Sequence, residues 1–105
     1  MTNWIRAASS GDIAEDMVIG VEVSGEAIAL YNLDGQFYAT DNICSHAFAL
    51  LSDGYLGDGT IECPLHAARF DVKTGKVLCA PATKDIRIYR TKVEGEDILI
   101  DLDPI

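Results

Sequence analysis

The chain has little cysteine, little histidine and no long apolar run. It holds three cysteines and two histidines in 105 residues, which is the wrong inventory for the disulfide framework of a small secreted domain. It has no run of about twenty apolar residues, the length that spans a membrane. A chain of this length folds as one domain, here residues 1–105, with its own core. These features predict a cytoplasmic protein in reducing surroundings.

Positive charge is also scarce, and it is unevenly placed. Seventeen acidic residues stand against eight Lys and Arg, giving a net charge of -9. Residues 1–62 contain ten of the acids and a single base, Arg6, whereas acids and bases balance from Cys63 onward. This charge disfavours nucleic-acid binding. The acidity fits two compatible interpretations: it keeps the protein in solution, or it steers the protein toward basic surfaces of partners.

No long helical period is present either. Short apolar runs alternate with glycine-containing turns, a pattern typical of an all-β sandwich or barrel. The clearest hairpin turn is Asp34-Gly35, because glycine tolerates the positive φ of such turns. Cys79 is expected to be a small buried apolar residue. We expect a short helical turn near 9–12 and strands over 3–7, 17–23, 27–32, 36–40, 60–62, 69–72, 77–79, 85–93 and 98–102.

The residues able to carry chemistry fall in two short motifs. Cys44-Ser45-His46 is followed, after sixteen residues, by Cys63-Pro64-Leu65-His66. Each motif supplies one soft thiolate and one borderline imidazole, which suit iron or zinc rather than magnesium or calcium. A Cys-x-His pair has too little chain between its ligands to wrap one ion, so we expect the motifs to address two metal atoms. Two irons bridged by sulfides fit, with cysteines on one iron and histidines on the other.

This arrangement resembles the Rieske-type ferredoxins, the [2Fe-2S] carriers of bacterial ring-hydroxylating dioxygenase systems. The similarity covers nearly the whole chain, from Trp4 through both motifs to Phe70-Asp71, Thr74-Gly75, Pro81-Ala82 and the last hairpin. It implies an all-β Rieske fold, with an antiparallel β-sandwich scaffold (1–40 and 71–105) and a cluster-binding insert of two loops (41–70). The sequence departs from the family where glycines commonly follow the ligand histidines, since it has Ala47, Ala67 and Ala68.

The resemblance also implies a function and a set of ligands. Cys44 and Cys63 are expected on the inner iron and His46 and His66 on the outer one, with Pro81 shielding the cluster from water. The protein is then a one-electron carrier and not itself an enzyme. Its expected donor is a flavin-containing, NADH-dependent reductase, and its expected acceptor is the Rieske centre of a terminal oxygenase for aromatic compounds. We expect a monomer; service to another oxygenase or reductase is the alternative.

The residues around the ligands predict a low reduction potential. Neutral imidazoles raise the potential of Rieske clusters into a window of about -150 to +300 mV. High-potential respiratory relatives add a disulfide, a serine and a tyrosine, but the matching positions here are Ala49, Leu65, Ala68 and Phe70. Because fewer donors stabilise the reduced cluster, we expect a potential near the lower end.

Two other kinds of site use similar residues. A structural Cys2His2 zinc ion in a binding module has the same ligand types, but the short Cys-x-His spacing opposes it. A nucleophilic Cys-His pair leaves the second motif unexplained. Next to the first motif, Phe48, Leu50 and Leu51 form an apolar loop. We expect such residues to anchor the loop inward, and any that are exposed to form a docking patch.

Overall fold

The computed structural model describes residues 3–44, 49–65, 67–79 and 84–103, which are built from β-strands and two single turns of 3-10 helix. The larger sheet has the order β1-β10-β9-β4-β3-β2 and the smaller one the order β5-β6-β7-β8, all antiparallel. The larger sheet contains β1 (Trp4–Ser9), β2 (Met17–Val23), β3 (Glu26–Leu33), β4 (Gln36–Asp41), β9 (Ile88–Glu94) and β10 (Asp97–Asp101). The smaller contains β5 (Tyr55–Gly57), β6 (Thr60–Glu62), β7 (Arg69–Asp71) and β8 (Val77–Cys79); the helical turns are η1 (Ser10–Asp12) and η2 (Leu51–Asp53).

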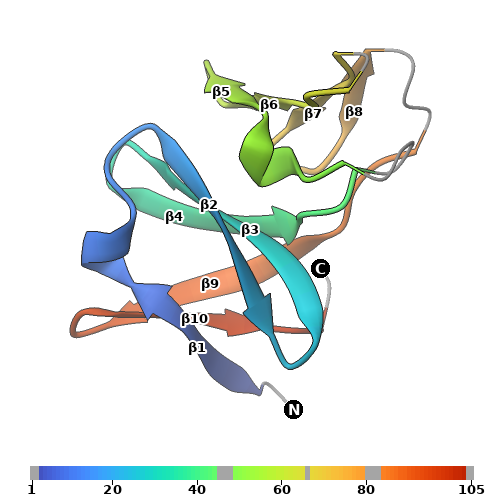
Figure 1. The fold of residues 1–105 in the computed structure, drawn as a ribbon. Helices are drawn as coiled ribbons and strands as arrows, with labels where there is room; N and C mark the ends of the chain where they lie inside the picture. Colours follow the sequence, from blue (N-terminus) through green and yellow to red (C-terminus); the bar gives the residue numbers. More distant parts are fainter. Residues whose placement is uncertain (1–2, 45–48, 66, 80–83, 104–105) are drawn as a thin grey trace.

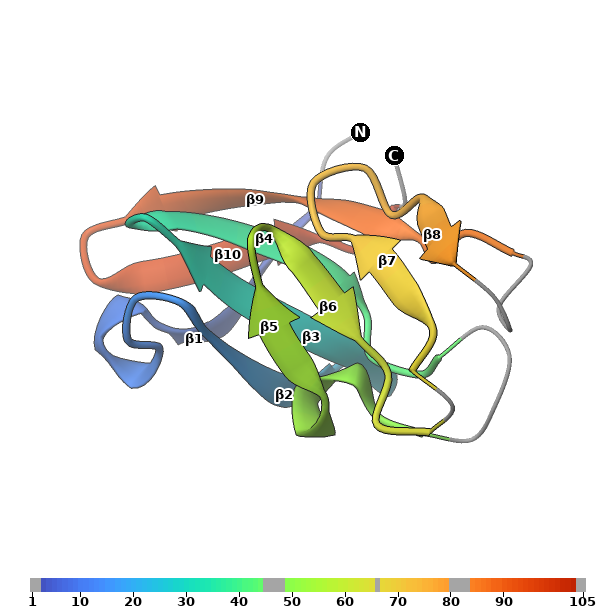
Figure 2. The ribbon, with the colours of Figure 1, turned by 90° about the horizontal axis from the view of Figure 1, so that it is seen from above.

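The larger sheet curls until its first and last strands, β1 and β2, contact each other (Figure 1). The smaller sheet lies against the outside of this curl (Figures 1 and 2). Strand β3 is therefore covered on both faces, and alternate side chains enter two different cores. Ile28 and Leu30 pack inside the curl, whereas Ala29 and Tyr31 pack toward the smaller sheet, and all four are fully buried.

The second core joins the two sheets and contains both motif cysteines. Cys44 and Cys63 pack there with Tyr31 from β3 and Phe70 from β7. The Tyr31 hydroxyl is satisfied by Thr40 Oγ1 at 2.8 Å, and burial raises the pKa of Tyr31 far above its ordinary value. The two motif cysteines therefore lie in a closely packed core, one side of which the larger sheet provides.

The structure confirms the all-β class and most predicted strands. Asp34 and Gly35 both have positive φ, 58° and 82°, as the predicted hairpin turn requires. The strand predicted over 85–93 begins only at Ile88. The residues before it bond to the smaller sheet instead: Asp85 accepts the Val77 N–H at 2.9 Å, and the Ile86 N–H donates to Gly75 O at 2.9 Å.

The prediction that Cys79 is buried is wrong, because this side chain is exposed. Cys79 ends β8, an edge strand of the smaller sheet, and none of the described strands pairs with its outer side. Val77 of the same strand does pack against the core. In the described part of the chain, no helix has the length and apolar character needed to cross a membrane.

Candidate metal centre

The two motifs form loops that are closed in the same way. The Cys44 N–H donates to Ala49 O at 2.9 Å, and the Cys63 N–H donates to Ala68 O at 2.7 Å. In each loop the cysteine thus bonds the residue five positions later, and the alanine that accepts the bond is buried. The four residues between the two ends include the motif histidine in both cases. The two motifs therefore stand in loops with the same closing hydrogen bond.

The two loops bring their thiols together. Cys44 and Cys63 are 4% and 1% exposed, and their side chains are hydrogen-bonded to each other. Burial raises the pKa of the Cys63 thiol; the backbone N–H of Leu65 favours the thiolate, and the neighbouring Cys44 opposes it. Burial thus disfavours the Cys63 thiolate, whereas a bound metal favours deprotonation of a ligating thiol.

This donor set fits one iron of a [2Fe-2S] cluster. Two sulfur atoms side by side in an apolar, water-excluding pocket can ligate one metal ion from two different loops. A backbone donor at the Cys63 sulfur is the type of outer contact that tunes such a centre. His46 and His66, with Ala47 and Pro81, lie outside the described residues.

Asn42 anchors the first ligand loop to the larger sheet. Its N–H donates to Ala27 O at 3.1 Å, and its side chain accepts the Ser52 N–H at 2.8 Å and donates to Ser52 Oγ at 3.0 Å. Gly20 of β2 lies directly over this pair: a Cβ at Gly20 would stand 2.7 Å from both Asn42 Nδ2 and Ser52 Oγ. The loop base is therefore fixed by side chains that sit just before and after the motif.

Asp41 fastens the strand that enters this loop to the strand that returns from the smaller sheet. Its carboxylate accepts the Tyr89 hydroxyl at 2.6 Å and the Arg87 Nε at 3.0 Å, and its N–H donates to Arg87 O at 3.0 Å. The hydrogen bond from Arg87 to this carboxylate raises the pKa of the guanidinium. The pKa of Tyr89 is also raised, mainly by burial and secondly by its hydrogen bond to Asp41. The chain passes from one sheet to the other after β4 and again before β9, and the bonds of Asp41 hold it at both places (Figure 1).

The second loop contains a residue with left-handed backbone geometry. Ala67 has φ 58°, and its carbonyl accepts a weak 3.5 Å contact from the Cys79 thiol. Only a small fraction of residues other than glycine adopt such φ values, because the Cβ crowds the backbone. The loop therefore takes this tight conformation without a glycine.

Apolar side chains are exposed beside both cysteines. Ile43 and Leu50 face each other in an isolated β-bridge at 49% and 42% exposure, and Leu65 of the second motif is 45% exposed. Leu51, by contrast, is fully buried and anchors the first loop. Phe48, the third apolar residue of that loop, lies outside the described part of the chain.

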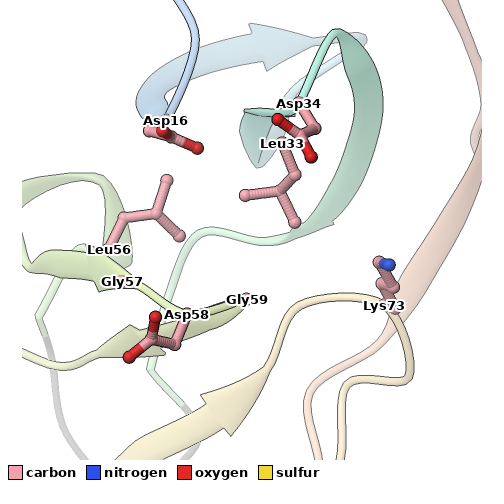
Figure 3. Close-up of a pocket in the computed structure, with 8 residues that line it drawn as sticks. All are labelled: Asp16, Leu33, Asp34, Leu56, Gly57, Asp58, Gly59 and Lys73. Atoms are coloured by element: carbon pink, nitrogen blue, oxygen red, sulfur yellow. The ribbon is translucent and has the colours of Figure 1, made fainter.

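A cleft of about 550 Å³ lies between the two sheets, away from the cysteines. Figure 3 shows Leu33 and Leu56 extending into it from opposite walls, with carboxylates around them and Lys73 to one side. It is lined by Asp16, Leu33, Asp34, Leu56, Gly57, Asp58, Gly59 and Lys73, none of which belongs to either motif.

Sequence reasoning did not identify the residues that hold the loops in place. Asp41, Asn42, Ser52 and Arg87 carry no metal-ligating pattern and lie outside both motifs. One signal was available: Asp41-Asn42 are polar residues between a predicted strand and the first cysteine, where a loop end needs side-chain bonds.

Comparison with known proteins gives a consistent result. The profile of the Rieske [2Fe-2S] domain family matches residues 3–90. The chain is 54% identical over 99 residues to the naphthalene 1,2-dioxygenase system ferredoxin component of Pseudomonas putida, covering 94% of this chain and 95% of that one. It resembles the ferredoxin of carbazole 1,9a-dioxygenase from Nocardioides aromaticivorans IC177, with TM-score 0.90, 32% identity and coverage of 95% and 98%.

A third similar protein was solved in an assembly. It comes from a complex of reduced oxygenase and oxidized ferredoxin in carbazole 1,9a-dioxygenase, and it matches with TM-score 0.92 and 28% identity over 100% of this chain and 98% of that one.

Proposed function

Because the chain belongs to the Rieske [2Fe-2S] domain family, we propose that it passes single electrons from a flavin-containing, NADH-dependent reductase to the Rieske centre of a terminal oxygenase. The protein is a Rieske ferredoxin of an aromatic dioxygenase system, an electron carrier rather than the catalytic component. It holds one [2Fe-2S] cluster, which supplies one-electron chemistry when bound. We place it in the cytoplasm as a monomer.

We assign Cys44 and Cys63 to the inner iron and His46 and His66 to the outer one. The observation that carries this assignment is the contact between the two buried thiols, delivered by loops with the same closing hydrogen bond. The cysteines are buried, and hydrogen bonds to Ala49 and Ala68 hold their backbones while Asn42 holds the base of the first loop. Ile43, Leu50 and Leu65 then offer apolar contact to a partner that approaches this end.

The ligand assignment is tested with purified holoprotein. The unmodified protein is expected to be red-brown with about two irons and two sulfides per chain. His46→Ala and His66→Ala are expected to lose the cluster, since one iron is left under-coordinated, while circular dichroism keeps its β-sheet signal. Full iron content and an unchanged visible spectrum in His46→Ala contradict the assignment. A colourless protein with stoichiometric zinc contradicts the function itself.

The electron route is tested by reconstitution. NADH, a ferredoxin reductase and a terminal naphthalene-type oxygenase are combined with or without this protein, and product formation is followed. We expect turnover to need the ferredoxin and the reductase together. Reduction of the ferredoxin without onward turnover contradicts the proposed acceptor and favours another oxygenase or reductase as the partner.

A further inference from the structure

Each ligand cysteine has an acidic residue close before it in the chain, and each of these acids is bound by an arginine. Glu62 directly precedes Cys63, and its Oε1 accepts Arg69 Nε at 3.0 Å. Asp41 precedes Cys44 by three residues, and its Oδ2 accepts Arg87 Nε at 3.0 Å. The pairs join β6 to β7 and the end of β4 to the start of β9, strands that lie side by side in Figure 2.

The two pairs join the acidic part of the chain to the charge-balanced part. The first 62 residues hold ten acids, and arginines bind Asp41, Glu62 and Glu26 among them in the described part of the chain. Glu26 reaches Arg87 only at 4.0 Å, so it shares a base that Asp41 already binds. The bases that meet these acids come from the second, charge-balanced part of the chain. Arg69 and Arg87 thus neutralise the acids that precede the two cysteines.

The bonds of Asp41 hold the chain crossings, but folding stability accounts for only part of the two ion pairs. Arg69 and Arg87 are 57% and 59% exposed, and exposed ion pairs contribute little to folding. The carboxylates are more enclosed, at 26% for Glu62 and 19% for Asp41. Their charge is therefore screened less by water, and it acts over a longer range inside the protein.

An uncompensated carboxylate here opposes reduction of a cluster. Neighbouring residues in a chain are about 3.8 Å apart at Cα, so both acids begin within about 12 Å of a cysteine. A cluster with two thiolates and two neutral imidazoles is formally neutral when oxidised and gains one negative charge when reduced. Negative charge nearby therefore lowers the reduction potential, and a guanidinium bound to that charge restores it.

We propose that Arg69 and Arg87 tune the reduction potential of the cluster by neutralising Glu62 and Asp41. Each arginine acts by offsetting the charge of the carboxylate it binds, and neither is a ligand of the cluster. The proposal rests on the proposed function, since it concerns the same cluster.

The test is the midpoint potential of holoprotein variants, measured by protein-film voltammetry and accepted only where the visible spectrum is unchanged. Arg69→Gln and Arg87→Gln are expected to lower the potential, and Glu62→Gln and Asp41→Asn to raise it. The doubles Glu62→Gln/Arg69→Gln and Asp41→Asn/Arg87→Gln are expected to return close to the unmodified value. The matched control is the pair Arg6–Asp97, with Nε–Oδ1 at 2.9 Å between β1 and β10; Arg6→Gln and Asp97→Asn should shift nothing.

The proposal is supported if acid and arginine variants shift the potential in opposite directions and the shifts cancel in the double variants. Loosening of the loops would instead shift the potential in the same direction in both single variants, without cancellation in the double. Shifts of one sign for acid and arginine variants, or no shift in any of them, overturn it. Absence of a cluster wave in the unmodified protein contradicts the proposed function instead. The two failures are therefore distinguishable.

Discussion

At the scale of single residues, Ala67 adopts a conformation that suits glycine better. Its φ of 58° places an alanine Cβ in the left-handed region, at a cost of roughly 1–2 kcal/mol. Glycine loses about 0.4–1 kcal/mol more backbone entropy on folding. We expect Ala67→Gly to stabilise the protein by about 0.5–1 kcal/mol, measured as a higher midpoint of cluster bleaching in urea.

The neighbouring Ala68 provides the matched control for this prediction. It is fully buried, packs in the core with Cys63, and has no positive φ. Ala68→Gly should therefore lower the same midpoint, because it removes a buried methyl group and adds backbone freedom. Equal effects of both substitutions contradict a specific strain at Ala67.

The low predicted potential is tested at Ala68 and Phe70. Ala68→Ser and Phe70→Tyr each add a hydroxyl where high-potential relatives have one, and a donor to cluster sulfur gains strength as negative charge arrives. Taking that gain as about 1 kcal/mol, and about 59 mV per tenfold change for one electron, each donor should raise the potential by about 40 mV.

Both side chains are fully buried in the core that contains Cys44 and Cys63. The added serine oxygen is small, whereas the tyrosine oxygen needs room in a packed interior. Voltammetry of the double variant Ala68→Ser/Phe70→Tyr tests whether the added hydroxyls raise the reduction potential. No shift, or a negative one with an intact spectrum, means that backbone donors such as the Leu65 N–H set the potential.

Residue identity indicates candidate ligands more readily than it indicates the residues that support them. Cysteine and histidine in repeated spacing have few alternative explanations, so the motifs could be found without a structure. Asp41, Asn42 and Ser52 are ordinary polar residues whose role depends on which strand ends they face. The exposure of Cys79 depends on an edge position in a sheet, which its own chemistry does not encode.

At the scale of elements, β2 and the first ligand loop are coupled through Gly20. A Cβ there would meet Asn42 Nδ2 and Ser52 Oγ at 2.7 Å, closer than real contacts allow. Gly20→Ala should push these side chains apart and loosen the base of the loop, costing about 1–3 kcal/mol. We expect faster loss of visible absorbance on heating than in the unmodified protein.

Gly57 in β5 is the control for this substitution. Nothing lies within 4 Å of a Cβ built there, and its φ is not positive. Gly57→Ala should leave the rate of cluster loss unchanged. If Gly20→Ala is equally harmless, the loop is not held by the Asn42–Ser52 contact that the structure shows.

Strands bounded by clear turn residues could be predicted, whereas the short strand β5, in a segment with three glycines, could not. Strand β2 matches its predicted bounds, and β3 and β4 differ by a residue or so at their ends, because Ser24-Gly25 and Asp34-Gly35 mark the turns. Strand β5 is only Tyr55–Gly57 and has no apolar alternation to reveal it. Sequence spacing also gave no sign that β7 pairs with β6, since that register depends on contacts between distant segments.

At the scale of the whole molecule, the segments that contain the two motifs combine exposed apolar side chains with a lack of charged residues. The segments 42–52, 63–68 and 77–83, which include both motifs, contain no Asp, Glu, Lys or Arg in a chain that is 24% charged. The exposed Ile43, Leu50 and Leu65 belong to these segments. Acids such as Asp16, Asp34 and Asp58 line the cleft away from the cysteines (Figure 3). Long-range attraction and close contact therefore fall to different parts of the molecule.

This separation predicts how electron transfer to the oxygenase responds to salt. Opposite charge on a partner accelerates encounter, and salt screens that attraction beyond about 8–10 Å at physiological ionic strength. The second-order rate in stopped-flow experiments should fall as ionic strength rises. The triple variant Asp16→Asn/Asp34→Asn/Asp58→Asn should be slower at low salt and show a flatter dependence, whereas Leu50→Ser should slow transfer at every salt concentration without changing the slope. A rate indifferent to salt means that the acidity serves only to keep the protein in solution, and that apolar contact beside the two loops carries recognition alone.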